Sequence, residues 1–415
     1  MENVRIGIFG CGPRGLWLGK EFKRIRGCSV VALCDEREGQ EPLAHEAFGA
    51  DCPFFTSFDE FIEQGLDAVL LCNLFYDHAR YAVKCLERGI HVLSECISNG
   101  TMAEGVQLVK AAKRSSAFYM LLENYPQMVV NREMQGVVKG GTLGKILYAE
   151  GEYNHPFNPA DTTFIKEYQY HAHHWRNYLP RTYYITHSLA PLMRATGSTP
   201  RFVSAVPCFA PADRDVTSAS HVGDRAAIIT TKNDDGTVYR ITGCAAFGAH
   251  HNSYRICGTN GQIENLRGMG EKIMLRYNEW QIPEGREEIN LYDAPINDPD
   301  AELIRQSAHG GGDYVTIRMF VECVRDKRQP EHPFDVDSAV AMSSCAILGL
   351  RSMLDGGKYY EIPDFNDEKW CKMYENDYIT PFYGVNDEPP TIPCCSVPDY
   401  EPTKEQMNRY FESLK

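Results

Sequence analysis

The sequence predicts an α/β domain with a parallel sheet, followed by an α+β domain with an open-faced, mostly antiparallel sheet. Up to about residue 120, short apolar runs alternate with helical patterns, as a parallel sheet with crossover helices requires. From Lys145 onward the runs are longer and alternate apolar with polar residues, which suits an antiparallel sheet with one covered face. The 415 residues, 43% of them hydrophobic, are enough for two or three domains.

The strands and helices of the first part are marked by local signals. Asp77 can cap a helix whose apolar residues recur at helical spacing until Gly89 stops it. Thr101 and Glu104 have the spacing of a capping box, which predicts the start of a further helix. The expected strands are Val4–Phe9, Ser29–Cys34, Ala68–Cys72, Ile90–Leu93 and Ala117–Leu121.

The second part is expected to begin near residue 124. Many prolines and aromatic residues in the last fifty positions indicate an arm that packs on a surface. We therefore expect three parts, at residues 1–123, 124–364 and 365–415. The clearest strands of the second part are Ile146–Tyr153, Arg225–Thr231 and Val238–Phe247, and its expected helices are Asp313–Val324 and Ser338–Leu354, the latter ended by Gly356 and Gly357.

Composition excludes several classes of function. The formal net charge of −14, with no run of Lys or Arg, argues against nucleic acid as a partner. No stretch approaches the ~20 apolar residues of a membrane span, and a strand that begins at Val4 leaves no room for a signal peptide. The fifteen cysteines include no C-x-x-C pair, so we expect most to be reduced packing residues. These features predict a cytoplasmic protein.

A glycine motif points to a dinucleotide. Gly10, Gly12 and Gly15 form a G-x-G-x-x-G that directly follows a strand and opens a helix, where backbone can approach a pyrophosphate closely. Asp35 stands twenty residues beyond Gly15, at the carboxyl end of the second strand, where a carboxylate can bind ribose hydroxyls. Its charge would repel a 2′-phosphate, which favours NAD over NADP, although Arg37 stands nearby. We predict an NAD-binding Rossmann domain.

The chain resembles the glucose-fructose oxidoreductase, inositol dehydrogenase and rhizopine catabolism (Gfo/Idh/MocA) superfamily up to about residue 364. The glycine motif, His78 and the segment Gly89–Glu95 carry this resemblance. Dehydrogenases of that superfamily usually carry Glu-Lys-Pro where this chain has Glu95-Cys96-Ile97, and Tyr183 replaces their usual aspartate. The ordinary dehydrogenase machinery is therefore incomplete. The cofactor-binding residues that we expect are Gly10, Gly12, Pro13, Arg14, Gly15, Asp35, Asn73, His78, Glu95 and Asn124.

A narrower resemblance accommodates the missing lysine. The chain is similar to the NAD-dependent α-N-acetylgalactosaminidases of glycoside hydrolase family 109, although it has Ile185 and Ser188 where that family has proline and glycine. The segments that carry the resemblance are Glu123–Tyr125, Glu150–Tyr153, Trp175–Arg176, Tyr184–His187, Tyr254, Gly258–Gly261, His309–Tyr314 and Ile362–Phe365.

The resemblance implies a hydrolysis in which tightly bound NAD is consumed and restored within one turnover. Hydride leaves sugar C3, the C2 proton then leaves, the C1 group is expelled, water adds, and C3 is reduced again. His187 is our candidate for handling the C3 hydroxyl proton. Tyr184 is the candidate C2 base, provided that oxidised nicotinamide or Arg176 lowers the pKa of its phenol. Tyr153, Arg176 and Tyr254 would bind sugar hydroxyls or a carboxylate.

Other interpretations stay open. A plain sugar or polyol dehydrogenase with an altered proton relay is the main alternative, and a non-catalytic NAD-dependent sensor is the third. His171 and His173 would share a strand face if their segment is extended, but with His174 they lack supporting ligands, so we expect a lining of the substrate cleft and no metal site. We also expect a homo-oligomer, in which another subunit covers the open sheet face and the arm.

Overall fold

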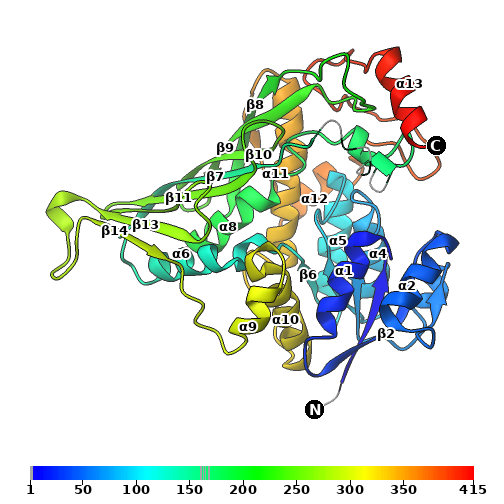
Figure 1. Cartoon of the computed structure of the whole chain (residues 1–415), viewed down its shortest axis with the longest axis horizontal. Coiled ribbons are helices and arrows are strands. Elements are labelled where there is room, and N and C mark those ends of the chain that lie inside the picture. The colour runs from blue at the N-terminus through cyan, green and yellow to red at the C-terminus, as the bar shows by residue number, and fades with distance from the viewer. Residues whose placement is uncertain (1–2, 159–160, 162, 164, 167–168) are drawn as a thin grey trace.

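The computed structural model describes residues 3–158, 161, 163, 165–166 and 169–415, and it contains two β-sheets. Figure 1 shows the first sheet with its helices in blue to cyan and the second in green to yellow, with α10 and α11 between them. The predicted fold class is confirmed. Within the described residues, no helix is long and apolar enough to cross a bilayer.

The first sheet has the strand order β3-β2-β1-β4-β5-β6, and all its pairs are parallel, as in a Rossmann domain. Its strands are β1 (Val4–Phe9), β2 (Cys28–Cys34), β3 (Phe54–Phe55), β4 (Ala68–Leu71), β5 (His91–Ser94) and β6 (Tyr119–Leu121). Its helices are α1 (Pro13–Phe22), α2 (Glu41–Phe48), α3 (Phe58–Phe61), α4 (His78–Glu87) and α5 (Met102–Arg114). The five predicted strands are confirmed to within two residues at each end, and β3 was missed.

Two helix starts were predicted, with different outcomes. Thr101 and Glu104 form the capping box of α5, since each side chain bonds the backbone of the other. Asp77 does stand before α4, but the prediction that its side chain caps the helix is wrong. Its carboxylate accepts a hydrogen bond from Arg80 at 2.6 Å instead, because an arginine one turn along the helix offers a charged donor.

The second sheet has the order β14-β13-β12-β11-β7-β10-β9-β8-β15 in the described residues, and it is antiparallel except for the parallel pair β7 and β10. Its strands are β7 (Ile146–Asn154), β8 (Pro200–Phe209), β9 (Asp224–Asn233), β10 (Val238–Ala245), β11 (His251–Gly258), β12 (Gly261–Asn265), β13 (Lys272–Tyr277), β14 (Ile289–Asp293) and β15 (Tyr360–Glu361). The mostly antiparallel sheet was predicted correctly.

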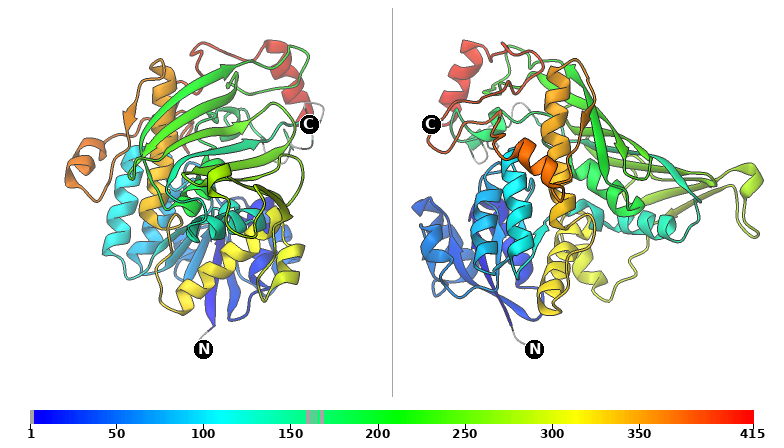
Figure 2. Two further views of the ribbon diagram at one scale, coloured as in Figure 1. Left: turned by 90° about the vertical axis from the view of Figure 1, so that its left-hand side faces the viewer. Right: turned by 180° about the vertical axis from the view of Figure 1, so that it is seen from behind.

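Helices cover one face of this sheet, as both views in Figure 2 show. α6, α8 and α11 pack on it, whereas α10 packs on α1 and β1 of the first sheet. The helices of this part are α6 (Val129–Lys139), α8 (Thr186–Thr196), α9 (Ala301–Gln306), α10 (Gly312–Arg325) and α11 (Val336–Leu354). α10 follows residue 124 in the chain yet packs against the first sheet, so the two parts contact each other closely, and the predicted division at residues 123 and 124 stays a prediction.

The C-terminal arm packs on its own chain. It contains α12 (Glu368–Tyr374) and α13 (Lys404–Ser413). Phe382 is buried and contacts the rings of Phe75, Tyr76 and Tyr183, so the arm supports both halves of the chain from outside. Other apolar side chains of the arm, such as those of Met373, Tyr378 and Val385, are more than half exposed, so the predicted cover by another subunit stays a prediction for the arm and for the open sheet face.

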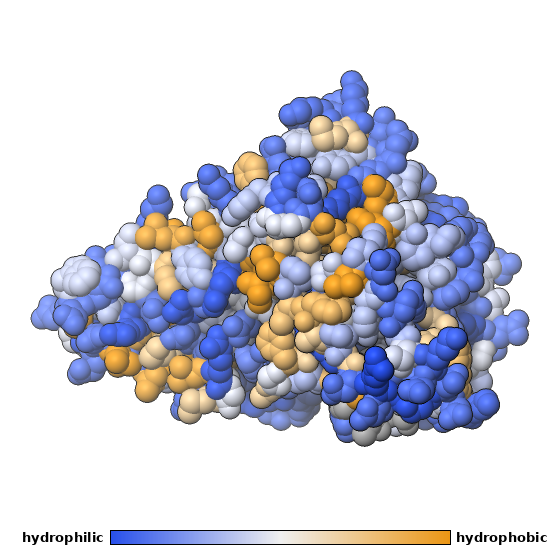
Figure 3. Space-filling model, turned by 90° about the horizontal axis from the view of Figure 1, so that it is seen from above, coloured by the Kyte–Doolittle hydropathy of each residue, from blue (hydrophilic) through white to orange (hydrophobic). Residues whose placement is uncertain are grey.

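The open face of the second sheet mixes charge with apolar side chains. Glu150 binds both Arg240 and Arg255 across three strands, at 3.0 and 2.6 Å. Ile228 on β9 and Leu291 on β14 are exposed on the same face by the strand register. Figure 3 shows such apolar residues in orange as separate patches among blue, hydrophilic ones. A face of this kind suits an interface with polar cross-contacts.

We predict that a second copy of the chain covers this open face. The double variant Ile228→Glu, Leu291→Glu should shift the protein toward monomer in sedimentation velocity, because two unpaired carboxylates would be buried in the interface. Leu43→Glu is the matched control, since Leu43 on α2 is 49% exposed and Leu291 62%. A wild-type protein that is monomeric at micromolar concentration would contradict the prediction.

Candidate active site

A cavity of about 780 Å³ lies at the carboxyl ends of the first sheet's strands, where the second part of the chain closes over them. It has room for a dinucleotide end and a small sugar. Its lining is Phe9, Gly10, Gly12, Pro13, Arg14, Gly15, Trp17, Asp35, Glu36, Arg37, Cys72, Asn73, Leu74, Phe75, His78, Glu95, Cys96, Tyr170, His171, His174, Trp175, Arg176, Tyr184, His187, Ala308 and His309.

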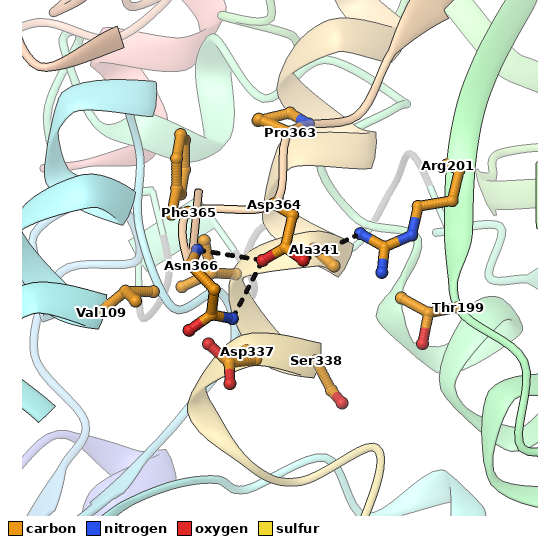
Figure 4. Close-up of a pocket in the computed structure, with 11 residues that line it drawn as sticks. Val109, Thr199, Arg201, Asp337, Ser338, Ala341, Pro363, Asp364, Phe365 and Asn366 are labelled. Atoms are coloured by element: carbon orange, nitrogen blue, oxygen red, sulfur yellow. Dashed lines mark hydrogen bonds and ion pairs between the residues drawn. The ribbon is translucent and has the colours of Figure 1, made fainter. Parts of the chain in front are cut away.

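A second cavity, beside α11, is much smaller. Figure 4 shows it around Asp364, whose carboxylate accepts hydrogen bonds from Asn366 and lies 3.8 Å from Arg201. Its volume of about 100 Å³ is below that of small-molecule sites, which begin near ~300 Å³. The larger cavity is therefore the candidate active site.

The glycine motif forms a cradle for a phosphate at one end of the larger cavity. Gly10 has φ +94°, and a Cβ there would lie 2.4 Å from the Cys72 backbone. A Cβ on Gly15 would lie 1.8 Å from the Gly10 carbonyl oxygen, so neither position admits a side chain. α1 begins at Pro13, and its N-cap, Gly12, has no side chain to occupy the first N–H groups. These N–H groups suit the pyrophosphate of a dinucleotide.

Asp35 and Arg37 lie at the adenosine end of the cradle. The Asp35 carboxylate accepts a hydrogen bond from the Cys11 N–H at 2.8 Å and is paired with the Arg37 guanidinium at 3.0 Å. Tyr170, from the second part of the chain, lies against that guanidinium, 5.5 Å from ring centroid to Cζ. A ribose bound here would meet a carboxylate already held in place, and Arg37 would flank the adenine.

Asn73 and His78 line the cavity beyond the fourth strand. The Asn73 amide donates to the Asp77 carbonyl, while its Oδ1 is buried and has no hydrogen-bond partner among the described residues. His78 Nδ1 contacts the Ile97 carbonyl oxygen at 2.9 Å, and burial lowers the pKa of this imidazole. A cofactor amide or hydroxyl would give Asn73 the partner it lacks. The residues of the cradle therefore fit NAD.

Arg14 and Glu95 lie on the cavity wall and pair with each other at 2.6 Å. Arg14 also reaches the buried carboxylate of Asp313 on α10, which accepts further hydrogen bonds from Trp17 and Asn124. Asn124 lies behind this cluster and outside the cavity lining, and its Oδ1 is buried without a hydrogen-bond partner among the described residues, so its contact with a cofactor stays a prediction. Burial opposes the charge of Asp313, yet hydrogen bonding to His309 and the charge of Arg14 hold its pKa well below the usual range.

His187 is held by a buried carboxylate. Its Nδ1 lies 2.8 and 3.0 Å from the two oxygens of Glu123, which is fully buried, while the ring borders the cavity. Burial alone would raise the pKa of Glu123, but the charge and hydrogen bond of His187 outweigh it and lower that pKa. Because an ionised carboxylate only accepts, Nδ1 carries a proton, and in the neutral form of the ring Nε2 is the acceptor.

The three predicted tyrosines are placed differently. Tyr184 lines the cavity, with its ring 5.2 Å from that of His187. Tyr153 is buried against both rings, at 5.7 and 5.0 Å, and lies outside the lining. Tyr254 lies behind His187 and is 1% exposed, and its hydroxyl donates to the His187 carbonyl at 2.6 Å. This geometry does not support the prediction that Tyr254 binds substrate, because its hydroxyl already donates to the backbone and the residue lies outside the cavity lining.

The pKa of the Tyr184 phenol is shifted in the direction opposite to the one that its predicted role as C2 base needs. Burial raises the pKa of its phenol far above the usual range, and the charge of Arg176 opposes this without reversing it. Arg176 itself lies over the ring of Trp175, at 4.3 Å, and Trp175 stacks on Phe75 at 4.7 Å. Arg176 is therefore placed on an aromatic platform at the cavity wall, but it does not by itself make Tyr184 a base.

The three neighbouring histidines do not lie on a strand. Their segment forms a turn followed by the short 3-10 helix η3 (Trp175–Asn177), so the shared strand face suggested for His171 and His173 is wrong. His171 and His174 line the cavity, as a substrate-cleft role requires. His173 lies outside, where it contacts Asp387 at 2.6 Å and stacks on Tyr383.

Four residues that shape the site were given no role from the sequence: Glu123, Asp313, His309 and Trp17. The first three stood only within segments that carry the family resemblance. Glu123 could have been found, because it follows a parallel strand as Asp35 and Glu95 do, and such strand ends meet at one edge of the sheet. Asp313 and Trp17 are 296 residues apart and meet only through the packing of α10 on α1, which leaves no local signal.

Comparisons with known proteins agree with this geometry. Residues 4–122 match the oxidoreductase family with NAD-binding Rossmann fold, and residues 210–372 match the C-terminal domain of glycosyl hydrolase 109. The chain is 25% identical over 413 residues to glycosyl hydrolase family 109 protein 2 of Akkermansia muciniphila, covering 89% of this chain and 84% of that protein. It is 26% identical over 416 residues to family 109 protein 1 of Shewanella sp. strain MR-4, covering 89% and 86%.

Solved structures share the fold. A levoglucosan dehydrogenase in complex with NADH and levoglucosan matches with a TM-score of 0.73 at 14% identity, over 88% of this chain and 100% of that one. A myo-inositol 2-dehydrogenase from Lactobacillus plantarum matches with a TM-score of 0.65 at 16% identity, over 87% and 100%. The first part of the chain therefore matches the Gfo/Idh/MocA oxidoreductase family with its NAD-binding Rossmann fold, and the second part matches the C-terminal domain of glycosyl hydrolase 109. Together these matches indicate an NAD-dependent glycosidase or sugar oxidoreductase.

Proposed function

We propose that the protein hydrolyses a small glycoside by transient oxidation at sugar C3, with NAD restored at the end of each turnover. The observation that carries this proposal is the Glu123–His187 pair beside a dinucleotide cradle, at a site where Cys96 replaces the lysine of ordinary dehydrogenases. The likeness to glycosyl hydrolase 109 proteins supports the same conclusion.

His187 handles the proton of the C3 hydroxyl in this proposal. Its Nε2 faces the cavity as an acceptor, since Nδ1 donates to Glu123. When bound, NAD supplies a reversible hydride acceptor for C3. Glu123 stabilises the imidazolium that forms, so His187 can keep the proton until C3 is reduced again. The resulting ketone makes the C2 proton acidic, and loss of that proton lets the C1 group depart.

Tyr184 is better suited to donate a proton than to accept one. Burial keeps its phenol protonated, and a nicotinamide that had accepted a hydride would carry no charge and would not lower the pKa of Tyr184. We therefore propose that Tyr184 donates a hydrogen bond to the departing oxygen on C1. Tyr153 holds the ring of Tyr184 from behind, and Arg176 binds a sugar hydroxyl or carboxylate from the Trp175 platform.

A plain sugar dehydrogenase is the alternative, and it is favoured by the overall likeness to the levoglucosan and inositol enzymes. The Glu123–His187 pair would serve that reaction as well. The two functions differ in what happens after C3 oxidation, since only the hydrolase restores NAD without a second substrate.

The cofactor balance separates the two functions. With a panel of 4-nitrophenyl glycosides, we expect nitrophenol release over many turnovers with no net NADH. His187→Gln should lower the rate of release by about 10²-fold or more, because the hydroxyl proton then lacks an acceptor. The measurement is nitrophenol and NADH absorbance in the same cuvette. Accumulation of NADH equal to ketone, without nitrophenol, would establish the dehydrogenase instead.

We also predict that NAD stays bound through purification, since restoration in place gains nothing from its release. Asp35→Ala should weaken NAD binding by about 1–3 kcal/mol, the value of two charge-assisted hydrogen bonds to ribose. Isothermal titration of stripped protein measures this, with Asp51→Ala, an exposed aspartate, as the control. Equal affinity of Asp35→Ala and wild type would disprove the assigned contact.

A further inference from the structure

Two histidines held by carboxylates flank the same tyrosine at this cavity. Tyr125 stacks on His187, with ring centroids 3.9 Å apart, and lies 5.9 Å from the ring of His309. His187 Nδ1 is bonded to Glu123, and His309 Nδ1 is bonded in the same way to Asp313, at 2.9 Å. Both imidazoles line the cavity. The mechanism above uses only the first pair and leaves the acceptor of the C2 proton unassigned.

The chemistry of His309 suits a proton acceptor. Asp313 is fully buried and its pKa is held well below the usual range, so it stays ionised and only accepts hydrogen bonds. His309 Nδ1 therefore carries a proton, and in the neutral form of the ring Nε2 holds the lone pair that can accept another, as for His187. The side chain of His309 is 37% exposed, so substrate can reach it.

The backbone around His309 is fixed in an unusual conformation. His309, Gly310 and Gly311 have φ values of +51°, +54° and +84°, and a histidine in this region is uncommon. A Cβ on Gly312 would lie 2.3 Å from the Asn124 carbonyl oxygen, so this loop is packed directly against the segment that carries Tyr125. Such strain is typical of residues held in place for function.

Three other polar side chains at or near the cavity are less suited. His174 Nδ1 accepts a hydrogen bond from the Arg176 N–H, so its Nε2 carries the proton and cannot accept another. His155 lies outside the lining, and burial together with the charges of His250, His187, Arg176 and His309 lowers its pKa to about 4. Burial keeps the phenol of Tyr184 protonated.

We propose that His309, oriented by Asp313, is the second proton-transfer residue of the site and takes the C2 proton. This inference rests on the proposed hydrolysis. As the C2–H bond breaks, the proton moves to His309 Nε2, the electron pair forms the C1–C2 double bond, and the C1–O bond breaks with its electrons on the leaving oxygen, which is protonated by Tyr184 or water. After water adds at C1, His309 returns a proton to C2. The step needs no oxidant beyond the C3 ketone.

The test compares two histidine variants in a single turnover of the NAD-loaded protein. The probe is whichever 4-nitrophenyl α- or β-hexopyranoside the wild type cleaves fastest. We expect His309→Gln to reduce the bound cofactor at the wild-type rate. Its rate of nitrophenol release should be at least about 10²-fold lower than that of the wild type, so that reduced cofactor accumulates. His187→Gln should show neither signal. His173→Gln is the control, because His173 also pairs with a carboxylate and is also 37% exposed, but lies outside the cavity lining.

Two further measurements distinguish the loss of a proton acceptor from weakened cofactor binding. Calorimetry should give His309→Gln the NAD affinity of wild type, and added imidazole should restore nitrophenol release in His309→Ala. Three results with His309→Gln would each overturn the role of His309. They are normal nitrophenol release, loss of cofactor reduction, and weakened NAD binding together with normal release at saturating NAD. If the wild type cleaves no glycoside at all, the proposed hydrolysis fails and this inference with it, whereas cleavage that survives His309→Gln refutes the inference alone.

Discussion

The buried carboxylate of Asp313 joins the two halves of the site, and the rest of the active-site geometry depends on it. It accepts hydrogen bonds from Arg14 and Trp17 on the helix that follows the glycine motif, and from Asn124 and His309 on the substrate side. A buried charge is tolerated only when it is fully paired, so these donors are held in one arrangement. The dinucleotide cradle and the sugar-facing residues are thereby placed at a fixed distance from each other.

This constraint explains how the site can do proton chemistry without a lysine. At the position where related dehydrogenases carry that cation, the Cys96 thiol lies 3.2 Å from Glu123. Burial raises the pKa of this thiol, so it stays neutral and donates to the carboxylate. Glu123 thus serves both Cys96 and His187. In the proposed mechanism two imidazoles, each bonded to a carboxylate, take the place of a single amine, and the ring of Tyr125 lies between them.

The sequence was most informative where local pattern determines structure. β1, the glycine turn and Asp35 follow one another within a short stretch, and their predicted positions agree with the structure because strand, turn and helix start are local choices. β3 could not be predicted, since two residues give no alternation. The role of Asp77 depended on Arg80, a competing partner that a capping rule does not consider. Tyr254 and Asn124 were placed at the ligand by likeness alone, whereas tertiary packing puts them behind His187 and Asp313.

The central claim is that cleavage passes through a C3 ketone and loss of the C2 proton. Cleavage of a glycoside in heavy water tests it directly, with NMR of the sugar product. Our account predicts one solvent deuterium at C2 in every product molecule, because the proton taken from C2 exchanges with solvent before another is returned. A product that carries protium at C2 after complete cleavage would contradict the account and indicate direct displacement at C1.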